Sequence, residues 1–169
     1  NARYGETFPI TEPLIGEDVG RILGLDGDAK MSKSLGNTVG ILADPDDVWD
    51  KVRTAVTDPQ RVRRDDPGRP EVCNVFALHQ FFTEENARKE IEAGCRSAEL
   101  GCVDCKRVLS GNIATSFAPY RERAAHYREH PSEVRDVLDR GAAKARKIAS
   151  ETMQEVRRKM GLNWRNAIP

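Results

Sequence analysis

A run of lysine and serine residues lies between two turn-forming segments near the start of the sequence, and consists of Lys30-Met31-Ser32-Lys33-Ser34. Asp26-Gly27-Asp28 precedes it and Gly36-Asn37 follows it. Because Gly, Asn and Asp accept tight and left-handed backbone, we predict an exposed loop. Two ammonium groups, two hydroxyls and free backbone N–H groups on such a loop suit a polyphosphate, and lysine can follow negative charge onto a leaving group. The alternative is a solvated loop without chemistry.

All four cysteines fall within residues 73–105, at Cys73, Cys95, Cys102 and Cys105. Three interpretations compete: buried structural thiols, disulfides, and a site in which four thiolates bind a metal. The clustering, and a Cys-x2-Cys pair that opens a predicted helix, favour the metal, because helix N-terminal N–H groups stabilise thiolates. The spacing does not separate a zinc ion from an iron–sulfur cluster. Free thiols without a metal remain a third interpretation.

Composition and charge limit the class of protein. The chain has 169 residues, 38% of them hydrophobic and 32% charged, and carries 27 basic against 27 acidic side chains. We find no long apolar run that would predict a membrane span or a secretory signal. Basic residues gather in a loop at 61–69 and in the last predicted helix, at Arg140, Lys144, Arg146, Lys147, Arg157, Arg158, Lys159 and, beyond it, Arg165. They mark either a solvated surface or an RNA-facing one.

The elements that must position these residues are mostly helical. Residues 1–25 hold short apolar pairs between Gly and Pro, which favour extended segments belonging to a sheet supplied from elsewhere. Asp44 followed by Pro45 predicts a helix start, with an apolar stripe to about Thr57. Further helices are expected from Pro70 to Phe82, from Glu84 to Ala93, from Cys102 to about Glu129 with a bend at Gly111 or Pro119, and after Pro131 until Gly161. From residue 44 onward we expect an all-α bundle.

The five-residue loop resembles the signature loop of class I aminoacyl-tRNA synthetases at all five positions, and Leu35-Gly36-Asn37 continues the resemblance. Over most of its length the chain is similar to the C-terminal half of bacterial-type tryptophanyl-tRNA synthetases. The stretches that carry this similarity include Arg3-Tyr4-Gly5-Glu6, Thr57-Asp58-Pro59, Leu100-Gly101-Cys102-Val103-Asp104-Cys105-Lys106-Arg107 and Pro119-Tyr120-Arg121-Glu122-Arg123. The run that contains the last two cysteines favours the tryptophan enzymes over the tyrosyl ones.

The resemblance implies a mainly α chain in two parts. Residues 1–43 would be the trailing edge of an α/β Rossmann-type catalytic domain with the signature loop. Residues 44–169 would be a helical anticodon-binding domain with the four-cysteine site. It also implies ATP, Mg²⁺, tryptophan and tRNA(Trp) as ligands, a homodimer, a cytoplasmic setting and no membrane.

Site residues follow from the same resemblance. Lys30 and Lys33 would contact the β- and γ-phosphates of ATP, while Met31, Ser32 and Ser34 shape the loop and contact phosphate oxygens. Ile22 matches a position that contacts adenine, mainly through backbone. Some members of the family hold a [4Fe-4S] cluster on a similar cysteine series, with a first interval one residue longer.

The sequence lacks the upstream HIGH-type signature and the amino-acid pocket of these enzymes. His79, His126 and His130 form no such motif, and we interpret them as surface or helix-packing residues. We therefore expect the chain alone to be inactive. Two rival functions are a non-catalytic helical metal-binding RNA module and a redox sensor built on the cysteines.

Overall fold

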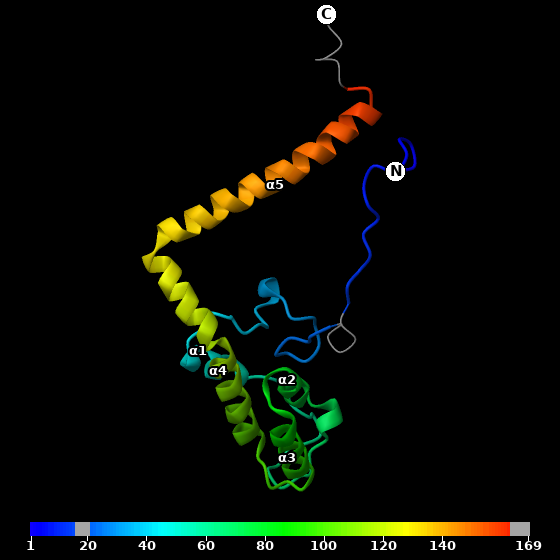
Figure 1. The fold of residues 1–169 in the computed structure, drawn as a ribbon. Coiled ribbons are helices and arrows are strands. Elements are labelled where there is room, and N and C mark those ends of the chain that lie inside the picture. The colour runs from blue at the N-terminus through cyan, green and yellow to red at the C-terminus, as the bar shows by residue number, and fades with distance from the viewer. Residues whose placement is uncertain (16–20, 163–169) are drawn as a thin grey trace, which may run out of the picture. The chain divides into compact units, whose positions relative to one another are not determined.

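A computed structural model of the chain describes residues 1–15 and 21–162 (Figure 1). The helices are α1 (Pro45–Val52), α2 (Asn74–Phe82), α3 (Glu85–Arg96), α4 (Cys102–Glu129) and α5 (Pro131–Lys159), with short 3-10 helices at Lys33–Leu35 (η1) and Pro70–Val72 (η2). The described residues contain no strand, only one antiparallel bridge between Leu23 and Lys30. The predicted mainly α fold is confirmed.

The chain divides into two compact units. One is residues 16–125, and the other combines residues 1–15 with 126–169. The first unit contains the lysine loop, the four cysteines and helices α1 to α3. A domain boundary at residue 43 stays a prediction.

Helix α1 begins as predicted but ends early. Asp44 is the extended N-cap residue and Pro45 is the first helical residue. The helix stops at Val52 rather than near Thr57, because the backbone that follows hydrogen-bonds to another segment instead of continuing the helix. The Val56 N–H donates to the Leu25 carbonyl at 2.9 Å, which ties this segment to the base of the lysine loop.

The helix predicted from Pro70 is broken at Cys73. Cys73 is buried and extended (φ −89°, ψ 114°), so η2 ends before it and α2 begins after it. Helix α3 passes through Gly94, which was expected to end it. The backbone takes a positive φ only after the end of α3, at Ala98 (φ 64°). Gly94 instead makes room for Leu100, whose Cβ would lie 3.1 Å from an added Cβ.

Helix α4 runs as one element through Gly111 and Pro119. Pro119 has no N–H to donate to the Thr115 carbonyl one turn earlier, and Arg121 contacts the backbone next to that position. Its guanidinium donates to the Ala114 carbonyl at 2.8 Å and to the Ala43 carbonyl at 3.4 Å. Arg121 thus joins the middle of α4 to the segment that precedes α1.

The core lies in the first unit and joins the loop to the helices. Its buried members come from the loop base, α1, α2 and α4: Leu25, Val48, Val52, Ala55, Cys73, Val75, Leu78, Leu109 and Ile113. Ile22, Met31 and Val39 pack against this cluster. The lysine loop is therefore anchored on the helical part of the same unit.

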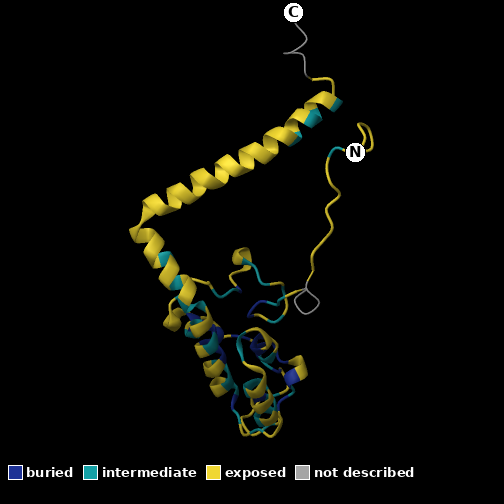
Figure 2. Cartoon of the chain, in the orientation of Figure 1, coloured by how far each residue is buried: buried dark blue, intermediate teal, exposed yellow. Residues whose placement is uncertain are grey.

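Helix α5 begins at Pro131, with His130 as N-cap residue, and Gly161 (φ 70°) follows its end as predicted. It has no buried residue among those described (Figure 2). Apolar side chains of this helix are exposed at positions such as Val134, Leu138 and Ile148, so this helix is not part of the core cluster. In the described part of the chain, every helix is too short or too polar to cross a membrane.

Candidate functional site

The lysine loop is closed by backbone pairing at its base. The Met31 N–H donates to the Ile22 carbonyl and the Gly24 N–H donates to the Ala29 carbonyl, both at 2.9 Å. The short helix η1 then covers Lys33–Leu35, and Gly36 ends it with φ 68°. Glycine accepts this left-handed backbone without penalty. The predicted exit turn is present, but the middle of the loop forms the short helix η1 rather than an irregular segment.

Asn37 holds this loop together, which the sequence interpretation did not predict. Its buried side chain accepts the Ser32 N–H at 2.8 Å and donates to the Asp26 carboxylate at 2.7 Å. The hydrogen bond from Asn37, followed by the one from the Asp28 N–H, lowers the pKa of Asp26 below its usual value. The Asn37 carbonyl also accepts the Leu25 N–H at 2.9 Å. The side chain and the backbone of Asn37 together therefore link the segments before and after Lys30.

The two lysines are exposed on this frame, whereas Ser32 is half-buried. Among the described residues, neither Lys30 nor Lys33 forms an ion pair with a carboxylate. The Ser32 and Ser34 hydroxyls lie 2.9 Å apart and hydrogen-bond to each other. The arrangement presents two cationic side chains and two hydroxyls from one short loop.

Ile22 and Met31 lie against apolar side chains of the helical part. Both line an apolar cavity of about 150 Å³, together with residues of α2 and α4 that include Phe82 and Phe117. The Ile22 carbonyl is occupied by the Met31 N–H. Met31 therefore anchors the loop, while a contact of Ile22 with adenine stays a prediction.

Gly24 sits where a side chain has no room. A Cβ at this position would lie 2.1 Å from Nδ2 of Asn37. We expect Gly24→Ala to displace Asn37 and to lower the free energy of unfolding by about 1–3 kcal/mol. Urea unfolding followed by circular dichroism measures this change. Gly111→Ala is the control, because an added Cβ there meets nothing within 4 Å and the substitution stabilises a helix by about 1 kcal/mol. Equal stability of wild type and Gly24→Ala would contradict the packing account.

The four predicted cysteines come together. Cys73, Cys95, Cys102 and Cys105 line one small pocket between the start of α2, the end of α3 and the start of α4. All four are free thiols, so the disulfide alternative is absent from this structure. Burial, followed by the charges of the three neighbouring cysteines, raises the pKa of the Cys105 thiol to about 12.

Three residues around this pocket were not singled out as site residues. Arg61 Nη1 donates to Cys95 Sγ at 3.8 Å, and its buried Nε has no hydrogen-bond partner among the described residues. A Cβ on Gly68 would lie 2.4 Å from Cys95 Sγ. His79 Nε2 lies 3.4 Å from Cys105 Sγ, and burial lowers the pKa of His79 to about 4. An arginine, a close glycine and a neutral imidazole thus surround the thiols.

The arginine-rich loop at 61–69 is partly structural. Arg69 donates to both carboxylate oxygens of buried Asp58, at 2.6 and 3.1 Å, and its N–H donates to the same side chain at 3.0 Å. Arg61 contacts Cys95 and the Arg64 carbonyl. This leaves Arg63 and Arg64 as the exposed arginines of the loop. An RNA-facing role of this loop therefore rests on Arg63 and Arg64.

Asp58 predicts a pH-dependent stability. The Arg69 guanidinium beside it holds the pKa of this carboxyl well below its usual range. Its contribution is complete above the ordinary carboxyl pKa of about 4 and is lost as the pH falls from there toward the folded-state value. We expect Asp58→Asn to lower the Tm by roughly 5–10 °C at pH 7 and by progressively less in acid. Calorimetry at several pH values measures both effects. Asp50→Asn, in an exposed pair with Arg53, should change the Tm little; an equal loss in both variants would contradict this assignment.

Comparison with known proteins decides the family. Residues 1–118 match the family model of class I tRNA synthetases (W and Y). The chain belongs to this family. The synthetase chain is 47% identical over 161 residues to the tryptophan–tRNA ligase of Deinococcus radiodurans, covering 95% of this chain and 49% of that protein. It is 44% identical to the tryptophan–tRNA ligase of Aquifex aeolicus, covering 96% of this chain and 41% of that one.

A solved structure agrees with this assignment. The tryptophanyl-tRNA synthetase of Campylobacter jejuni, complexed with ADP and tryptophan, matches the synthetase chain with a TM-score of 0.79 and 35% identity. The match covers 96% of this chain and 50% of that one. The resemblance to tryptophanyl-tRNA synthetases is confirmed. The synthetase chain spans about half the length of the curated relatives it matches.

Proposed function

We propose that the synthetase chain contributes the lysine loop and the helical part of a tryptophan–tRNA ligase. The complete enzyme would join tryptophan to ATP, release pyrophosphate, and transfer the tryptophanyl group to the 3′ end of tRNA(Trp). The observation that carries the proposal is an exposed pair of lysines on a loop fixed by Asn37, in a chain 47% identical to a tryptophan–tRNA ligase. We place this enzyme in the cytoplasm, as a homodimer.

Lys30 and Lys33 act by electrostatics. Tryptophan activation displaces pyrophosphate from the α-phosphate, so negative charge builds up on the β- and γ-phosphates. Two ammonium groups that meet this charge stabilise the transition state more than the bound substrate. No covalent nucleophile is required, because adenylate formation of this kind depends on positioning and charge. Ser32 and Ser34 supply hydroxyl donors next to the lysines, and Mg²⁺ would accompany ATP and neutralise part of its charge.

The four cysteines fit a metal centre by their chemistry. An all-sulfur donor set suits zinc or an iron–sulfur cluster. We favour a [4Fe-4S] cluster, which the resemblance to family members with a similar cysteine series implies, with a tetrahedral zinc ion as the alternative.

Such a cluster would join the starts of α2 and α4 to the end of α3. The Arg61 guanidinium beside Cys95 would offset its negative charge and donate N–H groups to sulfur, which includes the Nε that lacks a partner. Gly68 would leave space beside Cys95. A bracing role follows from this placement, because a bound group supplies folding energy to the segments that hold it.

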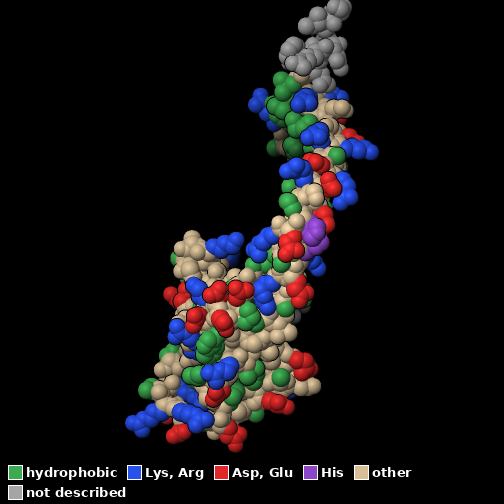
Figure 3. Space-filling view, turned by 90° about the vertical axis from the view of Figure 1, so that its left-hand side faces the viewer, with side chains coloured by type: hydrophobic (Ala, Val, Ile, Leu, Met, Phe, Trp, Pro, Cys, Tyr) green, Lys and Arg blue, Asp and Glu red, His purple; other side chains and the backbone are tan. Residues whose placement is uncertain are grey.

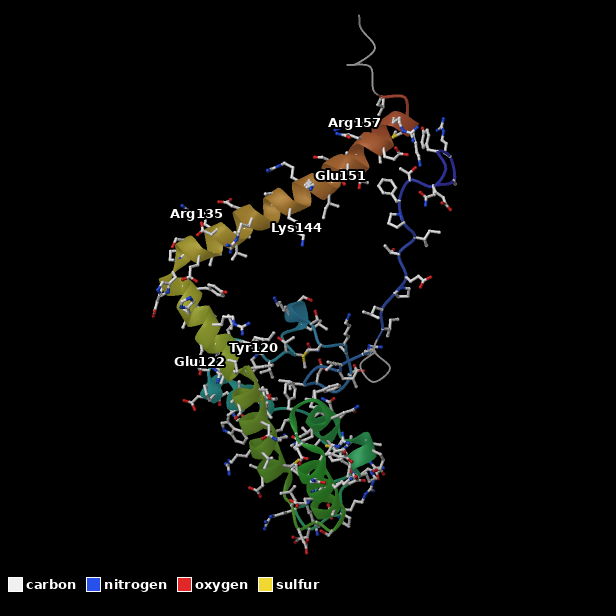
Figure 4. The ribbon with its side chains drawn as sticks, viewed as in Figure 1. Tyr120, Glu122, Arg135, Lys144, Glu151 and Arg157 are labelled. Atoms are coloured by element: carbon white, nitrogen blue, oxygen red, sulfur yellow. The ribbon has the colours of Figure 1, made fainter. Side chains whose placement is uncertain are left out.

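We assign the binding of tRNA(Trp) to the helical part. It is supported by Arg63 and Arg64 in the loop and by the exposed basic side chains of α5. Figure 4 shows Arg135, Lys144 and Arg157 extending from this helix, with Glu151 between them. Arg165 lies outside the described residues. Such contacts neutralise phosphates without selecting a sequence.

A chimeric enzyme tests the proposed function. The synthetase chain would replace the matching 161-residue segment of the Deinococcus radiodurans ligase, and ATP–pyrophosphate exchange would be measured with tryptophan and with tyrosine. We expect tryptophan-dependent exchange by the chimera and none by the chain alone. A folded chimera without exchange would contradict the function as a ligase segment and favour the non-catalytic RNA-binding module. Exchange by the isolated chain would contradict the expectation that this chain is inactive without the rest of the enzyme.

A further inference from the structure

Two histidines and a glutamate meet where α4 ends and α5 begins. The metal-binding atoms of His126, His130 and Glu133 all lie within 4.8 Å of one another, and all three residues are exposed. His126 belongs to the last turn of α4, His130 is the N-cap residue of α5, and Glu133 lies in its first turn. All three lie in the unit that contains residues 126–169. Figure 3 shows exposed histidine side chains beside acidic ones.

The local backbone brings these side chains together. His126 and His130 are four residues apart, and the His130 N–H donates to the His126 carbonyl at 3.0 Å, so the helical path continues to His130. Their imidazole rings stack with centroids 4.3 Å apart. The Glu133 N–H then donates to the His130 carbonyl at 3.1 Å, and this turn brings the carboxylate back to His126. Its Oε2 lies 3.0 Å from His126 Nε2.

The hydrogen bond of His130 leaves one ring nitrogen free to bind. His130 Nδ1 lies 2.9 Å from the His126 carbonyl oxygen, which can only accept, so Nδ1 carries the proton. The neutral ring then has an unprotonated Nε2. Histidines that bind metals commonly donate their other N–H to a backbone carbonyl in this way, which fixes the tautomer and the ring orientation. The hydrogen bond to the His126 carbonyl thus holds the His130 ring in a fixed orientation beside His126.

The distances suit a single ion. Bonds of about 2.0–2.1 Å from a divalent transition metal to imidazole nitrogen and carboxylate oxygen place neighbouring ligand atoms about 3 Å apart at right angles. The separation between His126 Nε2 and Glu133 Oε2 has this value. Two imidazoles and a carboxylate suit zinc, nickel or copper, whereas calcium and magnesium prefer oxygen ligands. Exposure leaves the remaining coordination positions to water.

We propose that His126, His130 and Glu133 form an exchangeable surface site for a divalent transition metal, separate from the four-cysteine pocket. A bound ion would tie the last turn of α4 to the first turn of α5 across the junction at His130. Since the three ligands include both sides of that junction, binding would stiffen it. The affinity should follow the usual order, with nickel bound more weakly than copper. This site does not depend on the proposed ligase function.

Nickel titration of the whole chain, with its cysteines occupied by iron or zinc, tests the site. Binding is followed by calorimetry and by paramagnetic broadening of assigned amide signals. We expect one Ni²⁺ per chain at this site, broadening centred on residues 126–133, and at least a tenfold loss of affinity in His126→Asn and Glu133→Gln. Glu151→Gln, at an exposed acidic residue further along α5 (Figure 4), is the matched control and should bind like wild type.

The outcomes separate the alternatives. Circular dichroism verifies that the variants retain the helix content of wild type. Unchanged nickel affinity in both variants would overturn the proposal, as would broadening centred on Cys102 and Cys105. A loss of affinity in Glu151→Gln as large as in Glu133→Gln would also overturn it, because it would show only general attraction of the cation to acidic residues.

Discussion

Replacing Lys33 by alanine in the complete ligase is expected to slow tryptophan activation about 100-fold, while tryptophan binds as in wild type. The physical reason is that a cationic donor aimed at developing charge contributes roughly 3 kcal/mol to the transition state, and each 1.4 kcal/mol corresponds to a factor of ten in rate. Lys33 is exposed at the start of η1 and forms no ion pair among the described residues. The measurement is single-turnover adenylate formation together with equilibrium binding of tryptophan.

Lys89→Ala is the matched control for this experiment. Lys89 is an exposed lysine of α3 that pairs with Glu85, and its removal changes the net charge by the same amount. It should leave the rate of activation unchanged. If Lys33→Ala weakened tryptophan binding as much as it slowed the reaction, the lysine would contribute uniform binding rather than transition-state stabilisation.

The second large effect is expected at the cysteines. Cys105→Ser should abolish the metal centre, because it removes one of four thiolate ligands, and should lower the free energy of unfolding by about 5 kcal/mol or more. Anaerobic purification followed by metal analysis and visible absorption measures the first effect, and urea unfolding the second. For wild type we expect a brown protein with about four iron atoms per chain.

The lysine variant serves as the control for the cysteine variant. Lys33→Ala should retain the iron and the stability of wild type, because the loop residues and the cysteine pocket share no side chain. A colourless wild-type protein with one zinc ion per chain would contradict the cluster and support the zinc alternative. A protein without metal whose stability is unchanged by Cys105→Ser would support buried structural thiols.

Local signals in the sequence were sufficient for the helix starts and for the loop. Pro45 and Pro131 begin helices where expected, and Gly36 and Gly161 take the left-handed backbone at the ends of η1 and α5. These features depend on a residue and its immediate neighbours. The gathering of four cysteines was also predictable from their clustering in the sequence.

What could not be predicted depends on contacts between distant segments. Val56 was expected in the last turn of α1 but lies outside the helix, because its N–H donates to the Leu25 carbonyl. Gly94 allows the approach of Leu100 rather than ending α3. Asn37 follows Gly36 and was interpreted as part of an exit turn, yet its side chain reaches Asp26. Propensity describes single residues, whereas these outcomes require knowing which backbone lies opposite.

Helix α5 shows the same limit of prediction from sequence. Its period predicts an amphipathic helix correctly, but periodicity does not identify what covers the apolar face. In the described residues that face is exposed at Val134, Leu138 and Ile148. The histidines were interpreted separately as surface or packing residues, because the turn at Pro131 that brings Glu133 to His126 is not apparent from their spacing.

The central claim is that ammonium groups at positions 30 and 33 meet the triphosphate as pyrophosphate leaves. The most direct test is tryptophan-dependent ATP–pyrophosphate exchange by the complete ligase that carries Lys30→Gln and Lys33→Gln together. We predict that exchange falls by at least about 1000-fold, since two cationic donors are lost, while tryptophan still binds and the metal content is unchanged. Exchange at the wild-type rate would contradict the account.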